Sequence, residues 1–117
     1  MKNREQAKTA SGINIAAGIW TILSPYILGF AAITAALTNN IIVGIIIGVL
    51  ALIRVYTPES SGGLSWINLL LGIWLIASPF ILGITSLAVI WNNIILGVIV
   101  AVMAVWSATA VTQEKHV

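Results

Sequence analysis

The stretch Ile41–Ile47, with the sequence IIVGIII, is apolar on every face that a helix or a strand could present. It lies in a run of roughly 45 residues without charge between Lys8 and Arg54, and a second run of roughly 54 residues separates Glu59 from Glu114. A membrane-spanning helix needs about 20 apolar residues, so each run is long enough for two crossings. Transmembrane strands alternate apolar and polar residues, whereas helices satisfy their own backbone hydrogen bonds in lipid. We therefore expect an all-α, four-helix transmembrane bundle.

The composition of the chain excludes most soluble classes of protein. Of the 117 residues, 60% are hydrophobic and 7% charged, and the mean hydropathy is +1.10. A soluble domain carries about 25% charged residues, so this chain cannot cover a water-facing surface. Cysteine and aspartate are absent, which leaves the acids Glu5, Glu59 and Glu114 and the single His116 in the polar tail. We expect no catalytic residue, no metal site and no cofactor, and therefore no enzyme.

The charged side chains form three short patches that predict the topology. With two crossings per apolar run, all three patches face the same side of the membrane, and the positive-inside rule makes that side cytoplasmic. The expected location is the inner membrane of a prokaryotic cell, with both termini in the cytoplasm. Five cations spread along one membrane face do not form a nucleic-acid site. The patches consist of Lys2, Arg4, Glu5 and Lys8; Arg54 and Glu59; and Glu114, Lys115 and His116.

The chain contains an internal repeat. The segment from residue 18 to 29 returns from residue 72 to 83 with glycine, tryptophan, Ser-Pro and Leu-Gly at the same spacing, and an Asn-Asn pair follows each copy. This order predicts a tandem duplication of a helical hairpin, with parallel repeats about an axis near the membrane normal. The motif residues are Gly18, Trp20, Ser24, Pro25 and Gly29 in the first copy, and Gly72, Trp74, Ser78, Pro79 and Gly83 in the second.

The repeat divides the chain into five predicted parts. A polar cytoplasmic N-terminus covers residues 1–10, and the first two-helix membrane repeat covers residues 11–56. A cytoplasmic linker of turn-forming residues follows at 57–63. The second two-helix repeat covers residues 64–110, and a polar cytoplasmic tail covers residues 111–117.

These repeated segments resemble the SPW repeat family of small membrane proteins. Each copy has a helix with Gly-x-Trp, Ser-Pro-aromatic and Leu-Gly, followed by a second helix that opens with asparagine. The resemblance extends from about Ile13 to Thr109, with Tyr26 and Phe80 in place of the tryptophan that names the motif. It implies a bacterial or archaeal integral membrane protein built of two-helix repeats. It implies no particular activity.

The Ser-Pro pairs predict bends in the first and third helices. Each proline removes a backbone donor and frees the carbonyl oxygen of Thr21 or Leu75. The serine before it, Ser24 or Ser78, can bond nearby backbone and so stabilise the bend. The alternative is a broken helix that lines a substrate site.

Small and amide side chains mark the expected helix contacts. Asn14, Gly18, Thr21 and Pro25 share one helical face, which predicts that the first helix packs directly on the third; alternatively, Asn14 and Asn68 form a polar site for a ligand or ion. Two small-xxx-small pairs indicate further contacts, either inside the bundle or between copies. The contact residues are Asn14, Asn68, Gly44, Gly48, Gly97 and Ala101, and the expected helix caps are Asn39, Asn40, Asn92 and Asn93.

These patterns favour a protein without catalytic activity, with a structural or interaction role as a homo-oligomer or as an accessory subunit of a larger membrane complex. Its expected partners are the lipid bilayer and either a membrane protein or a second copy. The alternatives are a small uncoupled transporter or channel, or a protein that binds an apolar ligand such as a lipid, quinone or pigment. Coupled transport is disfavoured because the predicted spans contain no ionisable Asp, Glu, Lys, Arg or His.

Overall fold

The structure, a computed structural model, describes residues 2–56 and 61–115 as four α-helices. The helices are α1 (Lys2–Ile27), α2 (Thr34–Tyr56), α3 (Ser61–Ile81) and α4 (Leu87–Lys115), and the described residues contain no strand. The predicted all-α, four-helix fold is confirmed. Residues 57–60 of the predicted linker and His116 lie outside the described residues, as do the side chains of the other terminal charged residues up to Glu5 and from Glu114.

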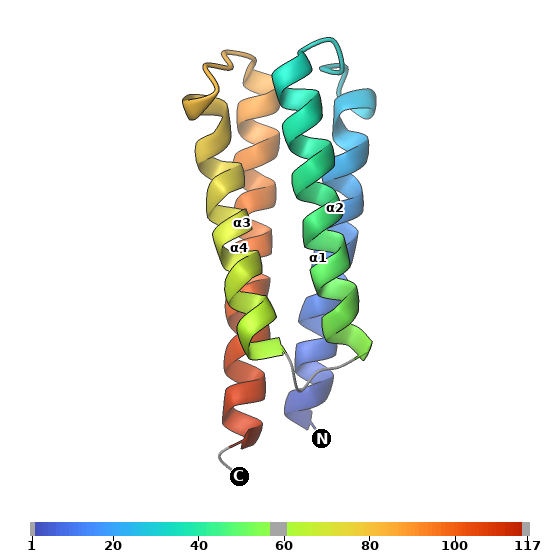
Figure 1. The fold of residues 1–117 in the computed structure, drawn as a ribbon, viewed down its shortest axis with the longest axis vertical. Helices are drawn as coiled ribbons and strands as arrows, with labels where there is room; N and C mark the ends of the chain where they lie inside the picture. The colour runs from blue at the N-terminus through green and yellow to red at the C-terminus, as the bar shows by residue number, and fades with distance from the viewer. Residues whose placement is uncertain (1, 57–60, 116–117) are drawn as a thin grey trace.

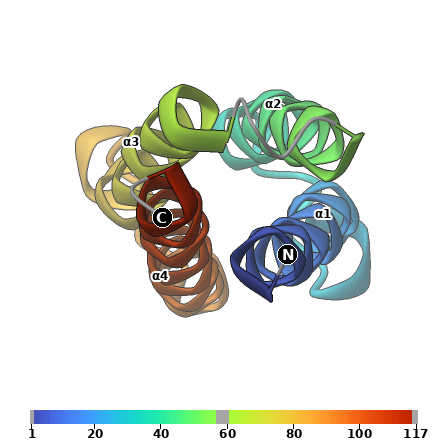
Figure 2. The ribbon, with the colours of Figure 1, turned by 90° about the horizontal axis from the view of Figure 1, so that it is seen from below.

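The four helices stand side by side as two hairpins that run in the same direction (Figure 1). The loops between α1 and α2 and between α3 and α4 lie at one end of the bundle, and both chain termini lie at the other. Viewed along the bundle, the helices form a ring in chain order, in which α1 packs on α2 and α4, and α3 packs on α4 and α2 (Figure 2). The expected packing of the first helix directly on the third is therefore wrong, because these two helices lie diagonally across the ring.

Three helices are long and apolar enough to cross a membrane. These spans are Thr34–Tyr56, Gly63–Ile81 and Leu87–Thr109. Among the described residues α1 does not meet the same measure, because it begins in a charged segment and carries polar residues along its length. Large apolar side chains such as Ile45, Leu70 and Val102 point outward, as expected where lipid rather than water surrounds the bundle.

Glycine lets the two helices of each hairpin approach closely. A Cβ atom on Gly18 would lie 2.9 Å from the carbonyl oxygen of Gly44 and 2.9 Å from the backbone nitrogen of Gly48. A Cβ atom on Gly72 would lie 2.8 Å from the carbonyl oxygen of Gly97 and 2.9 Å from the backbone nitrogen of Ala101. Real Cβ atoms do not approach backbone so closely, so only glycine fits where α1 crosses α2 and α3 crosses α4.

Left-handed glycines follow the first helix of each hairpin, and the return helices begin earlier than the sequence suggests. Gly29 and Gly83 have φ angles of +80° and +70°, the left-handed conformation that ends many helices. After Gly29, α2 already begins at Thr34, and the amide of Leu37 donates to the carbonyl oxygen of Ile33 at 2.9 Å. The predicted helix-cap role is therefore wrong for all four asparagines, which lie in the second turn of their helices: Asn39, Asn40, Asn92 and Asn93.

Candidate functional site

Two asparagines from different hairpins meet at the centre of the bundle. The Nδ2 atom of Asn40 donates to Oδ1 of Asn93 at 3.0 Å, and Nδ2 of Asn93 donates to Oδ1 of Asn40 at 3.1 Å. Both side chains are fully buried. A reciprocal amide pair of this kind satisfies one donor and one acceptor on each residue and ties α2 to α4.

The serines of the Ser-Pro motifs extend this pair to α1 and α3. Asn40 and Asn93 each donate at 3.4 Å to a serine hydroxyl, that of Ser24 and Ser78 respectively. These hydroxyls donate in turn to the carbonyl oxygens of Thr21 at 2.9 Å and Leu75 at 3.1 Å.

Those two carbonyls are the groups that the prolines leave without their usual helical donor. The prediction that serine satisfies them is confirmed by both hydrogen bonds. Pro25 and Pro79 lie in the last turn of their helices, two residues before Ile27 and Ile81, where loss of a backbone donor disturbs little of the helix. The predicted bend stays a prediction.

The two motif tryptophans complete the set of contacts between the hairpins. The indole Nε1 of Trp20 donates to Oδ1 of Asn92 at 2.9 Å, and that of Trp74 donates to Oδ1 of Asn39 at 2.8 Å. Each bond joins a helix of one hairpin to the other hairpin. We call these eight side chains the motif network: Trp20, Ser24, Asn39, Asn40, Trp74, Ser78, Asn92 and Asn93.

The motif network is uncharged, and its members bond mainly to one another. The remaining amide donors stay inside it, because Asn39 donates to Ser78 at 3.2 Å and Asn92 donates to Asn93 at 3.3 Å. Asparagine, serine and tryptophan do not titrate near neutral pH, so the network offers no general acid or base. Its chemistry is that of a hydrogen-bonded contact between two hairpins.

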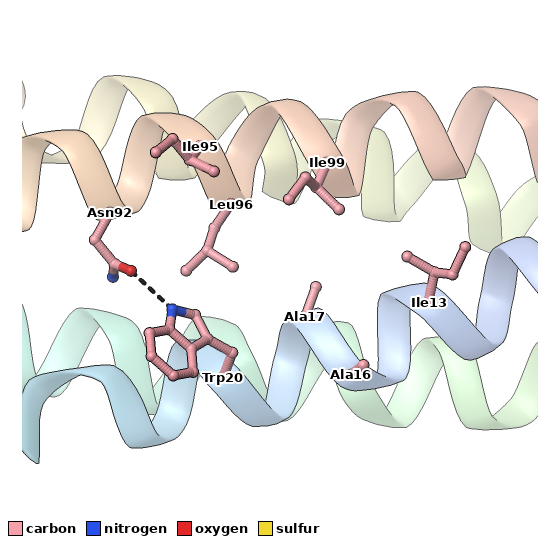
Figure 3. A pocket seen from close by; sticks show the side chains of 8 residues that line it. All are labelled: Ile13, Ala16, Ala17, Trp20, Asn92, Ile95, Leu96 and Ile99. Atoms are coloured by element: carbon pink, nitrogen blue, oxygen red, sulfur yellow. Dashed lines mark hydrogen bonds between the residues drawn. The ribbon is translucent and has the colours of Figure 1, made fainter. Parts of the chain in front are cut away.

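An apolar groove opens beside the network between α1 and α4 (Figure 3). It has a volume of about 490 Å³, and the bond from Trp20 to Asn92 lies at one end. The helix pair α2 and α3 has Leu70 and Leu71 at the positions that correspond to Ala16 and Ala17. The groove is lined by Ile13, Ala16, Ala17, Trp20, Asn92, Ile95, Leu96 and Ile99.

The half of the bundle near the termini also has a polar interior, but with fewer partners. The Oγ atoms of Ser11 and Ser107 lie 3.5 Å apart, and Asn14 donates at 3.5 Å to the carbonyl oxygen of Val100 in α4. Asn68 is fully buried, and neither its Oδ1 nor its Nδ2 has a hydrogen-bond partner among the described residues; Oδ1 of Asn14 also lacks one. Asn14 and Asn68 thus face the interior without a direct bond to each other.

Arg54 is the residue whose position sequence reasoning missed. The sequence assigns it to a charged patch at the membrane surface, whereas its side chain is fully buried. Nη1 donates to Oγ of Ser65 at 2.9 Å across the contact of α2 with α3. Alignment of the two halves matches Arg54 with Ser107 and Ser65 with Ser11, but only the order of the helices in the ring shows that the members of each pair meet.

No metal site is formed by the part of the chain that the structure describes, where no three His, Asp or Glu side chains gather.

The predicted contact residues differ in what they contact. Gly44 and Gly97 face the first helix of their own hairpin, against the carbonyl oxygens of Gly18 and Gly72, whereas the open side of Gly48 has no atom within 4 Å.

Comparison with known proteins identifies a family. The family model for the SPW repeat domain matches residues 8–107 of this chain. No curated protein and no solved structure matches it. The matched range includes the whole motif network, the groove and Arg54.

Proposed function

Since this chain belongs to the SPW repeat domain family, we propose that it is a non-catalytic integral membrane protein that acts through contacts within the bilayer. It does so as a homo-oligomer or as an accessory subunit of a larger membrane complex. The observation that carries the proposal is the motif network, because the polar side chains of the family motif bond to one another across the two hairpins. A motif engaged in this way stabilises a scaffold.

The same proposal includes the topology. Three helices are apolar enough to cross the membrane, and α1 packs along both α2 and α4, so the bundle would carry α1 across with them. Four crossings would place both termini on one side. The lysines and arginines are confined to the segments at that end, which favours the cytoplasmic side of an inner membrane.

The outer surface supports an interaction role. Large apolar side chains cover it, and two shallow grooves of about 260 and 280 Å³ lie along the two hairpins at corresponding positions. Gly48 and Val49 line one groove, and Ala101 and Val102 line the other. In lipid, helices associate through close packing at small residues, so these grooves suit a further transmembrane helix.

Site-specific cross-linking tests the proposal, because the chain contains no cysteine of its own. Single variants Val49→Cys and Val102→Cys place a thiol in a groove, and Ile73→Cys places one on an exposed position outside both. In native membranes we expect a maleimide–benzophenone reagent, which adds to the thiol and on illumination inserts into a C–H bond of the neighbouring chain, to join the groove variants, but not the control, to a second copy or to one defined subunit. Native mass spectrometry should show the same larger species. A monomer in both experiments contradicts the proposal.

The groove between α1 and α4 favours a second candidate function, the binding of an apolar ligand such as a lipid, quinone or pigment. Ala16 and Ala17 leave this groove open, whereas the corresponding positions of the other seam carry the larger side chains of Leu70, which is exposed, and Leu71, which packs against the core. The double variant Ala16→Leu/Ala17→Leu introduces the residues that stand at the corresponding positions in the second half of the chain, so it should fold. Mass spectrometry of the purified proteins should detect a bound compound in the wild type that the variant loses. Equal retention by both proteins would contradict this function.

A further inference from the structure

Arg54 carries a permanent positive charge into the interior of the bundle. Its side chain is fully buried two residues before the end of α2, and its described partner is the hydroxyl of Ser65 at 2.9 Å from Nη1. Nε and Nη2 have no hydrogen-bond partner among the described residues. A buried guanidinium with unpaired donors is unfavourable unless an anion or other acceptor meets it.

The unpaired atoms define the kind of ligand. Nε–H and Nη2–H form the side edge of the guanidinium, whose two parallel donors match two oxygens of one carboxylate or phosphate group. Asn68 follows Ser65 by one helical turn on the same face of α3, and its amide is fully buried without a described partner. A third unpaired donor group therefore lies on the helix that Arg54 contacts.

The second half of the chain shows that the bundle does not need this charge for packing. Ser107 corresponds to Arg54, and it meets Ser11 where Arg54 meets Ser65. Serine thus suffices at the contact of α1 with α4. Arginine at the contact of α2 with α3 adds a charge and two free donors that the packing alone does not require.

The contact between α2 and α3 is the smallest of the four contacts between neighbouring helices. These helices pack against each other less extensively than α1 packs against α4. An oxyanion that reaches the buried guanidinium has to separate α2 from α3, and less packing joins these two helices than joins α1 to α4. Tyr56, two residues after Arg54, is 79% exposed at the end of the apolar span, the depth at which lipid headgroups lie.

We propose that Arg54 binds a phosphate-type oxyanion in the seam between α2 and α3, with Ser65 holding the guanidinium in place and Asn68 as a further donor. Basic pockets between transmembrane helices at the headgroup level bind anionic lipids. The same chemistry recognises free phosphate, so the source is either a phospholipid headgroup or the soluble anion.

The test uses the full chain, purified in detergent and stripped of lipid. Tryptophan fluorescence measures the unfolding of the protein at increasing concentrations of inorganic phosphate, with chloride keeping the ionic strength constant. The same measurement is made in micelles that contain phosphatidylglycerol or phosphatidylcholine. Stabilisation by phosphatidylglycerol alone assigns a lipid headgroup, and stabilisation by phosphate assigns the free anion. Either result supports the proposal, and no response in any arm overturns it.

Substitutions then assign the response to the guanidinium. Arg54→Ser should fold, since Ser107 stands at the corresponding position, and should bind about 10-fold more weakly or worse, as expected for loss of charge-assisted hydrogen bonds. Arg54→Lys keeps the charge but not the paired donors, so its affinity for the oxyanion should fall nearly as far. Lys8→Ser removes the same charge from an exposed position of α1 and should bind as the wild type does.

Two results would overturn the proposal at this stage. One is undiminished binding by both Arg54 variants, and the other is an equal loss in Lys8→Ser, which would indicate a general charge effect. The reverse variant Ser107→Arg offers a gain of function, since it places the same guanidinium opposite Ser11. This variant should bind a second oxyanion, between α1 and α4.

Discussion

Asn40 and Asn93 exchange two hydrogen bonds, at 3.0 and 3.1 Å, through the centre of the ring, where they join the diagonally placed helices α2 and α4. The bonds join residues that follow the Ser-Pro motif at corresponding places in the two halves of the chain. Lipid offers amides no competing partner, and apolar packing alone does not select one arrangement of helices over another. The amide pair therefore specifies how the hairpins meet.

Gly18→Ala should weaken the contact of α1 with α2. The new Cβ atom would lie 2.9 Å from backbone atoms of Gly44 and Gly48, and backbone cannot move aside as a flexible side chain can. We expect a loss of about 1–3 kcal/mol in the free energy of unfolding, measured in mixed detergent micelles. Gly12→Ala is the matched control, because its Cβ atom meets nothing within 4 Å. It should be neutral or stabilising, and an equal loss in both variants would contradict the close contact.

Trp20→Phe should destabilise the bundle by about 1–2 kcal/mol, since it keeps the aromatic ring but leaves Oδ1 of Asn92 without the indole donor at 2.9 Å. Trp91 lies 61% exposed on the surface, and Trp91→Phe should change the free energy of unfolding by less than about 0.5 kcal/mol. Equilibrium unfolding followed by far-ultraviolet circular dichroism measures both. An equally small loss of free energy in both variants would show that the bond to Asn92 does not stabilise the bundle.

Gly29→Ala should lower the free energy of unfolding by about 1–2 kcal/mol, for a reason other than crowding. No atom lies within 4 Å of the added Cβ, but the φ angle of +80° disfavours any residue with a side chain. Gly63→Ala meets equally open space in the first turn of α3 and has no positive φ angle, so it should be tolerated. Thermal unfolding in detergent separates the two variants. A midpoint shift of the same size in both would exclude backbone strain as the cause.

The topology can be tested with single cysteines at the two ends of the bundle. Thr34→Cys and Thr85→Cys are exposed at the loop end, and Lys8→Cys is exposed near the N-terminus. A membrane-impermeant maleimide should label the loop variants in intact cells and the Lys8 variant only after permeabilisation, because the cations should remain in the cytoplasm. Labelling of Lys8→Cys and Thr85→Cys from the same side would rule out this arrangement.

The elements of the fold could be predicted because lipid imposes simple requirements. The uncharged runs between Lys8 and Arg54 and between Glu59 and Glu114 determined the number of helices, and hydrocarbon leaves few alternatives to helix. The hydrogen bonds from Ser24 and Ser78 were also predictable, since a proline always frees the same carbonyl. These inferences depend on a residue and its near neighbours in the sequence.

Contacts between helices could not be predicted in this way. The sequence predicts Asn39 and Asn92 as helix caps, whereas α2 and α4 begin five residues earlier, at Thr34 and Leu87. Their bonds to the tryptophans depend on the ring order of the helices. The burial of Arg54 depends on the same order, because α2 must lie beside α3 for Ser65 to accept its hydrogen bond.

A double-mutant cycle on Asn40 and Asn93 tests most directly whether the motif residues hold the hairpins together. The free energy of unfolding is measured for the wild type, Asn40→Ala, Asn93→Ala and the double variant. Membrane hydrogen bonds show coupling of about 0.6 kcal/mol on average and up to about 1.7, and the exchanged pair of bonds should lie toward the upper value. We predict coupling of that size. If the free energy lost by the double variant equals the sum of the losses of the two single variants, the amide pair does not hold the hairpins together.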